Sequence, residues 1–181
     1  MLLPIAPEPF SVPTNRDMLP SERRLFVRTH RSCVLGYGRL HDGPAMSVVY
    51  YVPTDEDELL VSTTAGRAKA RAIVRNPKIS LCVLDERWPL VYLQVYADAV
   101  IDADPRLAVD VLMAVAGRMS GEPTSEDTRP FFESMAEEEH RVVLRCRPYS
   151  TFAQPRPVKA GEEPAVQGIS GSVRWDASDP S

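Results

Sequence analysis

A long alternating run from Leu90 to Asp102 limits the fold of this chain more than any other feature of the sequence. Every second residue of the run is apolar, namely Val91, Leu93, Val95, Ala97, Ala99 and Ile101. The positions between them include Tyr92, Gln94, Tyr96 and Asp98. Because side chains alternate between the two faces of a strand, the run predicts a long β-strand with one face on a core and the other in more polar surroundings.

Shorter apolar runs on either side of this strand predict a small antiparallel sheet. The expected strands cover residues 33–40, 45–52, 58–64, 79–84, 140–146 and 148–152. A hairpin is expected between the first two, because Asp42-Gly43 between apolar runs favours a tight turn. Helices are expected at residues 21–29, 66–76, 104–120 and 130–139. This order of elements indicates a mainly β fold with α (α+β), a small barrel with peripheral helices, and its exposed strand edges favour pairing of two chains.

Proline marks the two ends of the expected domain. Of the 17 prolines, 9 fall within the first 20 residues or after Ala153. We therefore expect an extended N-terminal segment at 1–20, one folded domain at 21–153 and a flexible C-terminal tail at 154–181. Within that tail, Val173-Arg174-Trp175 is a stretch able to dock on the domain. The 181 residues are about the length of one domain.

The composition of the chain bears on its location, and the spacing of its cysteines and histidines bears on its metal content. No apolar run approaches the roughly 20 residues that cross a bilayer, and the N-terminal residues lack the regions of a signal peptide. A cytoplasmic protein without membrane contact is expected. Three separated cysteines, Cys33, Cys82 and Cys146, lie in apolar runs, which favours reduced, packed thiols. The three histidines show no spacing typical of metal ligands, so no metal is expected.

The segment from Ala65 to Lys78 contradicts the charge of the rest of the chain. The protein has a net charge of −4, yet this segment carries five cations and no carboxylate. Arg67 and Lys69 fall where a helix is expected to begin, just after Thr63 and Thr64, which are good N-cap candidates. Cations near the positive end of a helix are unfavourable unless an anion is present. The pattern therefore predicts a phosphate site at this helix N-terminus.

Two other interpretations of the basic segment remain open. Arg67, Arg71 and Arg75 recur every four residues, which is also the pattern of a solvated basic helix face. Nucleic-acid binding is disfavoured because the whole chain is acidic and only one helix is basic.

A second group of candidate site residues is aromatic. No group of residues in the sequence is an obvious general acid–base pair. Trp88, Tyr92, Gln94 and Tyr96 form a strip that suits either an aromatic ring ligand or a subunit interface. Ser47 has no Gly-x-Ser-x-Gly turn and no apparent His and Asp partners, which argues against a hydrolase. The lack of an evident general acid or base favours chemistry carried by a cofactor.

The order of these pieces resembles one known family. The stretches are Gly43 to Tyr50, Leu59 to Thr64, Gly66 to Arg71, and Arg75-Asn-Pro-Lys78 followed by Ile79 to Val83. They resemble the pyridoxamine 5'-phosphate oxidase-like, FMN-binding split-barrel family, and look most similar to its actinobacterial branch of flavin and deazaflavin oxidoreductases that use coenzyme F420. The resemblance covers about residues 22–152 and departs from the pattern at Tyr96-Ala97, where relatives usually show an acidic residue and glycine.

The resemblance implies a six-stranded antiparallel split β-barrel and a homodimer with a cofactor in each of two grooves between the subunits. Carried onto this sequence, Thr63, Thr64, Arg67 and Lys69 would hold the cofactor phosphate. Ser47 and the backbone around Val48 would face the ring, and Trp88 would approach from the second subunit.

The resemblance also implies an activity. The expected function is an oxidoreductase that transfers a hydride between bound F420, or FMN as the nearest variant, and a small conjugated substrate. The alternative is a flavin- or haem-binding module without turnover, and a third reading is a protein that uses this fold as an interface without a cofactor.

Overall fold

One curled antiparallel sheet dominates the computed structural model, which describes residues 1–2, 17–85, 91–153 and 172–180. Its strands follow the order β2-β1-β5-β6-β7-β4-β3, and β8 pairs with β7 off this path. The strands are β1 (Ser32–Tyr37), β2 (Ala45–Tyr50), β3 (Val52–Pro53), β4 (Leu59–Thr64), β5 (Lys78–Asp85), β6 (Val91–Asp102), β7 (Arg141–Ala153) and β8 (Val173–Arg174).

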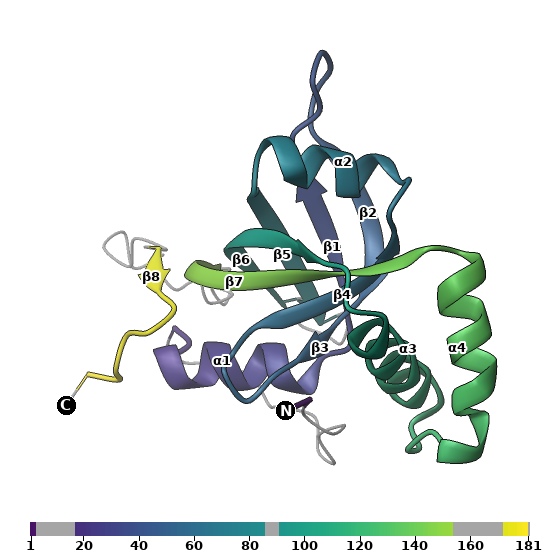
Figure 1. The fold of residues 1–181 in the computed structure, drawn as a ribbon. Helices are drawn as coiled ribbons and strands as arrows, with labels where there is room; N and C mark the ends of the chain where they lie inside the picture. Colours follow the sequence, from purple (N-terminus) through teal and green to yellow (C-terminus); the bar gives the residue numbers. More distant parts are fainter. Residues whose placement is uncertain (3–16, 86–90, 154–171, 181) are drawn as a thin grey trace.

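The helices surround this sheet. They are α1 (Pro20–Thr29), α2 (Ala68–Arg75), α3 (Pro105–Ser120), the 3₁₀ turn η1 (Glu126–Thr128) and α4 (Arg129–Glu138). Figure 1 shows α2 over the upper end of the sheet, α1 below it, and α3 and α4 together on one side. None of the described helices is long and apolar enough to cross a membrane.

The alternation in β6 is confirmed. Its apolar residues from Val91 to Ala99 point into the main core, and the tyrosines between them are half-buried on the other face. The fully buried side chains of this core include Phe26, Leu35, Tyr51, Leu81, Leu93 and Leu144. A second core lies on the opposite side of β4 and β7, where Leu60 and Val143 contact Ala108 and Val111 of α3.

The described residues form eight strands, where the sequence patterns predict seven and the family resemblance implies six. Two of them, β3 and β8, are only two residues long, which is too short to leave a periodic signal. The expected separate strand at 148–152 is instead part of β7, which continues through Pro148. The register between β6 and β7 shifts at Tyr96/Ala97, so a β-bulge accommodates the proline within one strand.

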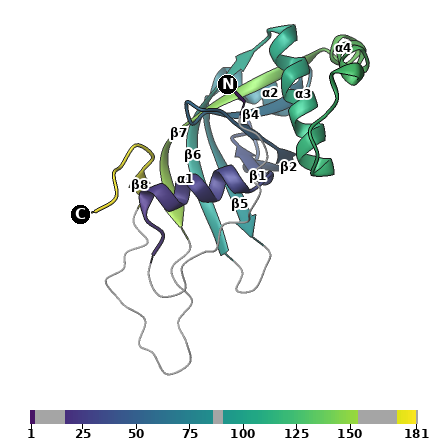
Figure 2. The ribbon, with the colours of Figure 1, turned by 90° about the horizontal axis from the view of Figure 1, so that it is seen from below.

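The stretch 172–180, expected to belong to a flexible tail, packs against the domain in the structure. Trp175 is 9% exposed and belongs to the main core, and its backbone N–H donates to the carbonyl oxygen of Tyr149 at 3.2 Å. The Asp179 carboxylate accepts hydrogen bonds from the N–H and hydroxyl of Ser21 at 2.9 and 2.5 Å. Figure 2 shows this stretch beside the beginning of α1.

Candidate functional site

A tight turn connects β4 to the basic helix α2 and is held at three points. The carbonyl oxygen of Thr64 accepts from the N–H of Arg67 at 3.1 Å. The N–H of Ala65 donates to the carbonyl oxygen of His140 at 3.0 Å. The Arg71 guanidinium donates to the carbonyl oxygen of Gly66. These contacts fix the direction in which α2 leaves the sheet.

The first turn of α2 keeps its anion-binding capacity. The helix begins at Ala68, with Arg67 at the N-cap in an extended conformation and no side chain capping it. The expectation that Thr63 or Thr64 caps the helix is wrong, because both residues belong to β4 and the turn separates them from α2. The N–H groups of Ala68, Lys69 and Ala70 have no partner four residues earlier within the helix, and the first turn has no acidic residue.

Lys69 is a buried cation near this helix end. It is 9% exposed, and no carboxylate within the described residues pairs with it. Burial lowers the pKa of its ammonium group, and the nearby Arg67 charge lowers it further. A buried cation beside a second cation is unfavourable unless an anion compensates both.

Two buried hydroxyl groups point to the same chemistry. Thr63 is 3% exposed, and its Oγ1 makes no hydrogen bond within the described part of the chain. The Oγ of Ser47 on β2 is also buried without a partner there. Both residues alternate with outward-facing neighbours, so their side chains point to the inner side of the sheet. Hydroxyl and ammonium donors of this kind fit a phosphate group.

These hydroxyls lie on two strands that face each other across the split of the barrel. In the described residues β2 pairs with β1 alone, and β4 beyond Leu60 pairs with β7 alone. The facing edges of β2 and β4 lie close together, as Figure 1 shows. Their backbone N–H and C=O groups along the split are therefore not used by the sheet ladders.

The structure separates the remaining predicted site residues. Val48 is 76% exposed on the outer face of β2, and Arg67 is exposed at the N-cap. Thr64 lies opposite Arg141 on the face of β4 that is turned away from Thr63. Trp88 lies outside the described residues. The structure therefore brings Thr63 and Lys69 to the buried side of one helix start, with Arg67 at its exposed side.

The other cations of the basic segment have local partners. Arg75 donates to the carbonyl oxygen of Arg71 at 3.0 Å, and Arg71 holds Gly66 as described above. Lys78 pairs with Asp98 at 2.7 Å and lies 4.5 Å above the ring of Tyr149. The solvated-face interpretation therefore fits the later part of the segment, and the ligand interpretation fits its start.

The cysteines are free in the structure. Cys33 and Cys146 are buried and Cys82 is half-buried. Burial raises the pKa of the Cys33 thiol to about 12, with Cys82 adding to the effect and Lys69 opposing it. The thiol of Cys33 is therefore held neutral and acts as a packed core group.

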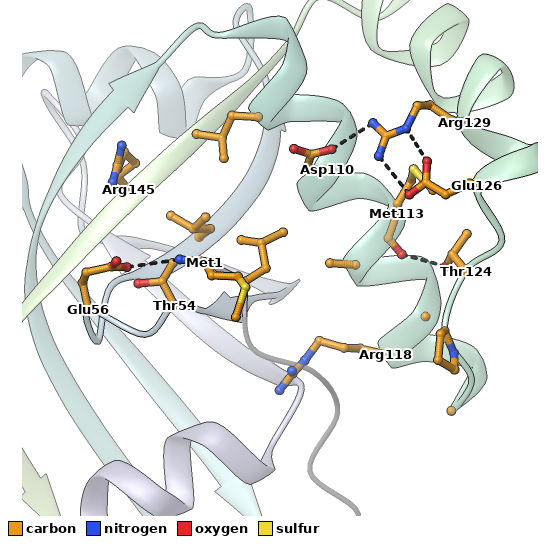
Figure 3. Close-up of a pocket in the computed structure, with 17 residues that line it drawn as sticks. Met1, Thr54, Glu56, Asp110, Met113, Arg118, Thr124, Glu126, Arg129 and Arg145 are labelled. Atoms are coloured by element: carbon orange, nitrogen blue, oxygen red, sulfur yellow. Dashed lines mark hydrogen bonds and ion pairs between the residues drawn. The ribbon is translucent and has the colours of Figure 1, made fainter.

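A cavity of about 1010 Å³ lies between α3, its connection to α4 and the turn before β4 (Figure 3). Leu60, Leu107 and Met113 form apolar parts of its wall. Two of its arginines are already paired, Arg129 with Asp110 at 2.9 Å and Arg145 with Glu58 at 2.5 Å. None of the described residues expected to bind the cofactor lines it, and the same holds for a cavity of about 540 Å³ between α3 and α4.

Reasoning from the sequence missed two residues that shape the site. His140 supplies a carbonyl group from the corner between α4 and β7, and no sequence pattern marks it. The sequence pattern gives Arg71 no individual role, and its spacing of five from Gly66 lets it reach back over the first turn.

Known proteins of similar structure share this fold. A conserved hypothetical protein from Mycobacterium tuberculosis is 21% identical with a TM-score of 0.69, covering 90% of this chain and 100% of that one. A protein described as an F420 reductase is 24% identical with a TM-score of 0.52, covering 67% and 88%. The haem storage protein HutZ from Vibrio cholerae is 18% identical with a TM-score of 0.52, covering 73% and 89%. At these identities the likeness shows the fold alone.

The sequence comparison identifies the family. No curated protein matches the chain. The sequence profile of the pyridoxamine 5'-phosphate oxidase family matches residues 19–149, which include the whole β4–α2 site. The chain therefore belongs to the pyridoxamine 5'-phosphate oxidase family.

Proposed function

We propose that this protein is an oxidoreductase that binds F420, or FMN as the nearest variant, with the cofactor phosphate at the N-terminus of α2. The observation that carries the proposal is the buried Lys69, which has no carboxylate partner in the described chain and lies where the first turn of α2 offers free N–H groups. When bound, either cofactor supplies a ring that exchanges a hydride with a small conjugated substrate.

The residues of the chain would bind and orient the cofactor. Lys69 offers a cation on the buried side of the helix start, the first turn of α2 offers N–H groups, and Arg67 offers an exposed charge at the same helix end. The hydroxyls of Thr63 and Ser47 would gain the hydrogen bonds that they lack in the described chain. F420 is favoured by the resemblance of the sequence to the deazaflavin branch, and the similarity in fold to an F420 reductase agrees with it.

A homodimer is part of this proposal. The outer face of the sheet exposes large apolar side chains, with Met46 at 74% and Val48 at 76%. In the sheet register Met46 pairs with Gly36, Gly36 with Ser80, and Ser80 with Tyr96. The side chains of these cross-strand partners therefore share one face of the sheet. Apolar side chains gathered on one face typically mark a protein interface. Light scattering should give about twice the chain mass of 20.1 kDa, and a monomer would remove the shared groove.

Binding is tested by titrating the purified protein with F420 and with FMN. The Arg67→Ala and Lys69→Ala variants should each bind the cofactor about 5- to 150-fold more weakly, because a lost charged hydrogen bond is worth about 1–3 kcal/mol. Arg75→Ala is the matched control, since it removes one charge from the far end of the same helix and should bind normally. Unchanged affinity in both site variants would refute the phosphate site.

Turnover separates the enzyme from a binding module. Protein loaded with reduced cofactor is mixed with candidate conjugated acceptors, and reoxidation is followed by absorbance. An enzyme should accelerate reoxidation above the rate of the free cofactor. Tight binding without acceleration would instead indicate a storage or sensing module, and binding of neither cofactor would reject both the enzyme and a flavin-binding module.

A further inference from the structure

We propose that His140 is a positioning residue for the cofactor phosphate, because its left-handed backbone fixes the turn that opens α2. The inference rests on the proposed cofactor site and adds a residue that the sequence comparison does not single out. His140 has φ +51°, and Asp57 is the one other non-glycine residue with positive φ in the described ranges. Such conformations are strained for residues with a Cβ and persist where the surrounding structure requires them.

The strained residue contacts the candidate site directly. β4 and β7 end together at the pair Thr64 and Arg141. The carbonyl oxygen of His140 accepts the N–H of Ala65 at 3.0 Å and so extends the pairing by one residue beyond the ladder. The left-handed backbone lets His140 make two contacts at the corner between α4 and β7. Its own backbone N–H donates to the Glu137 carbonyl oxygen at 3.1 Å, and its carbonyl oxygen accepts from Ala65.

The turn depends on this contact for its first point of attachment. Its other two points, Arg67 to Thr64 and Arg71 to Gly66, join residues within the β4–α2 segment itself. The His140 contact is the one of these three that ties the turn to a distant part of the chain. Losing it would leave the turn internally bonded but free to shift relative to β7, and the first N–H groups of α2 would shift with it.

The imidazole ring has no part in this argument. The side chain of His140 is exposed, and the contact to Ala65 uses the backbone carbonyl alone. The substitutions at position 140 are therefore chosen to vary how readily the backbone adopts the left-handed region. His140→Gly and His140→Asn remove the imidazole but tolerate the left-handed region, whereas His140→Val disfavours it because valine is β-branched.

The experiment measures affinity for F420 and FMN, the unfolding temperature without cofactor, and hydrogen exchange at the Ala65 amide. His140→Gly and His140→Asn should bind both cofactors within about twofold of the wild type. His140→Val should bind both about tenfold more weakly and exchange the Ala65 amide faster. Asp57→Val is the control at the other left-handed residue; it also removes the ion pair with Arg28, and it should lower the unfolding temperature without changing cofactor affinity.

The outcomes separate this inference from the proposed function. If the wild type binds neither cofactor, the proposed function fails. If the wild type binds and His140→Val binds equally well, the positioning role is refuted. Weakening by His140→Gly and His140→Asn to the same degree as by His140→Val would also refute it, because the imidazole would then be responsible. If His140→Val does not fold, His140→Ala with Asp57→Ala as control gives the same comparison.

Discussion

Buried polar groups at the α1 end of the barrel are paired, whereas those at the α2 end are not. Arg23 at the α1 end is 5% exposed and donates to the carbonyl oxygen of Met18 at 3.2 Å and to the Thr151 hydroxyl at 3.1 Å. Lys69 and Thr63 at the α2 end are 9% and 3% exposed, Lys69 forms no ion pair within the described residues, and the buried Thr63 hydroxyl has no hydrogen-bond partner there. The indole nitrogen of Trp175 and the Nε of Arg28 are exceptions at the α1 end.

The difference in pairing of buried polar groups indicates different roles for the α1 and α2 ends of the barrel. A paired buried group contributes to stability, and an unpaired one lowers it by about 1–3 kcal/mol. Unpaired groups are therefore expected where a ligand completes them, since functional sites commonly break the rules that hold elsewhere in a fold. The α1 end closes the core, and the unpaired groups at the α2 end fit the ligand site that we propose there.

The largest expected effect tests the closed end. Trp175→Ala should lower the free energy of unfolding by about 3–5 kcal/mol, because a large buried side chain leaves a cavity in the core. Arg174→Ala is the neighbouring control, since that side chain is 80% exposed and pairs with Asp176 alone within the described residues. Denaturant unfolding of both variants measures the difference, and a small loss for Trp175→Ala would show that residues 172–180 do not close the core.

The buried carboxylate of Glu58 is expected to make the free energy of unfolding depend on pH. Burial opposes ionisation of Glu58, but hydrogen bonds from Arg147 and Arg145 outweigh it and hold the pKa of this carboxyl below its ordinary value. Its stabilising effect is thus present above the ordinary glutamate pKa and is lost as pH falls through the lower folded value. Glu58→Gln should lower the free energy of unfolding by about 2 kcal/mol at pH 7.

The Glu58→Gln difference should shrink as the pH is lowered below about 4, where the wild-type carboxyl also becomes neutral. Glu56→Gln in the same turn should change little, because its side chain is 69% exposed. Unfolding curves at several pH values check both points. A difference that is independent of pH would mean that the charge of Glu58 is not what the arginines stabilise.

One substitution made at both ends compares them directly. Thr151→Val removes a buried hydroxyl that accepts from Arg23 and donates to the Val173 carbonyl oxygen at 3.3 Å, and should cost about 1–2 kcal/mol of stability. Thr63→Val removes a buried hydroxyl without a described partner, and should leave the cofactor-free protein equally stable or up to about 1 kcal/mol more stable. Equal destabilisation by both would remove the contrast between the ends.

The smallest effect is expected at the turn before α2. A Cβ added at Gly66 meets nothing within 4 Å, and Gly66 is not among the glycines with positive φ. Gly66→Ala should therefore change the free energy of unfolding by less than about 0.5 kcal/mol. Weaker cofactor binding in this variant, measured by titration, would show that the cofactor approaches the backbone at Gly66.

The sequence predicted the elements whose residues carry a regular pattern. β6 followed from its alternation, and the end of α2 followed from Asn76-Pro77, because the residue before proline leaves the helical region. β3 and β8 could not be predicted, because two residues show no period. The docking of Trp175 depends on contacts with α1 and β7 that are distant along the chain.

The sequence predicted which residues belong to the candidate site but not the directions of their side chains. Thr63 and Lys69 were identified from their place beside a helix start in a basic segment. That Thr63 points inward and Thr64 to the opposite face depends on the register of β4 with β7. The role of His140 depends on a single backbone angle, which sequence patterns do not encode.

The central claim is that the start of α2 binds the cofactor phosphate, and ligand-induced thermal stabilisation tests it most directly. The unfolding temperature is measured with and without saturating F420 or FMN for the wild type, the Arg67→Ala/Lys69→Ala double variant and Arg75→Ala. A ligand that binds only the folded state raises this temperature in proportion to its affinity. The account predicts equal increases for the wild type and Arg75→Ala and a much smaller one for the double variant, whereas equal increases in all three would contradict it.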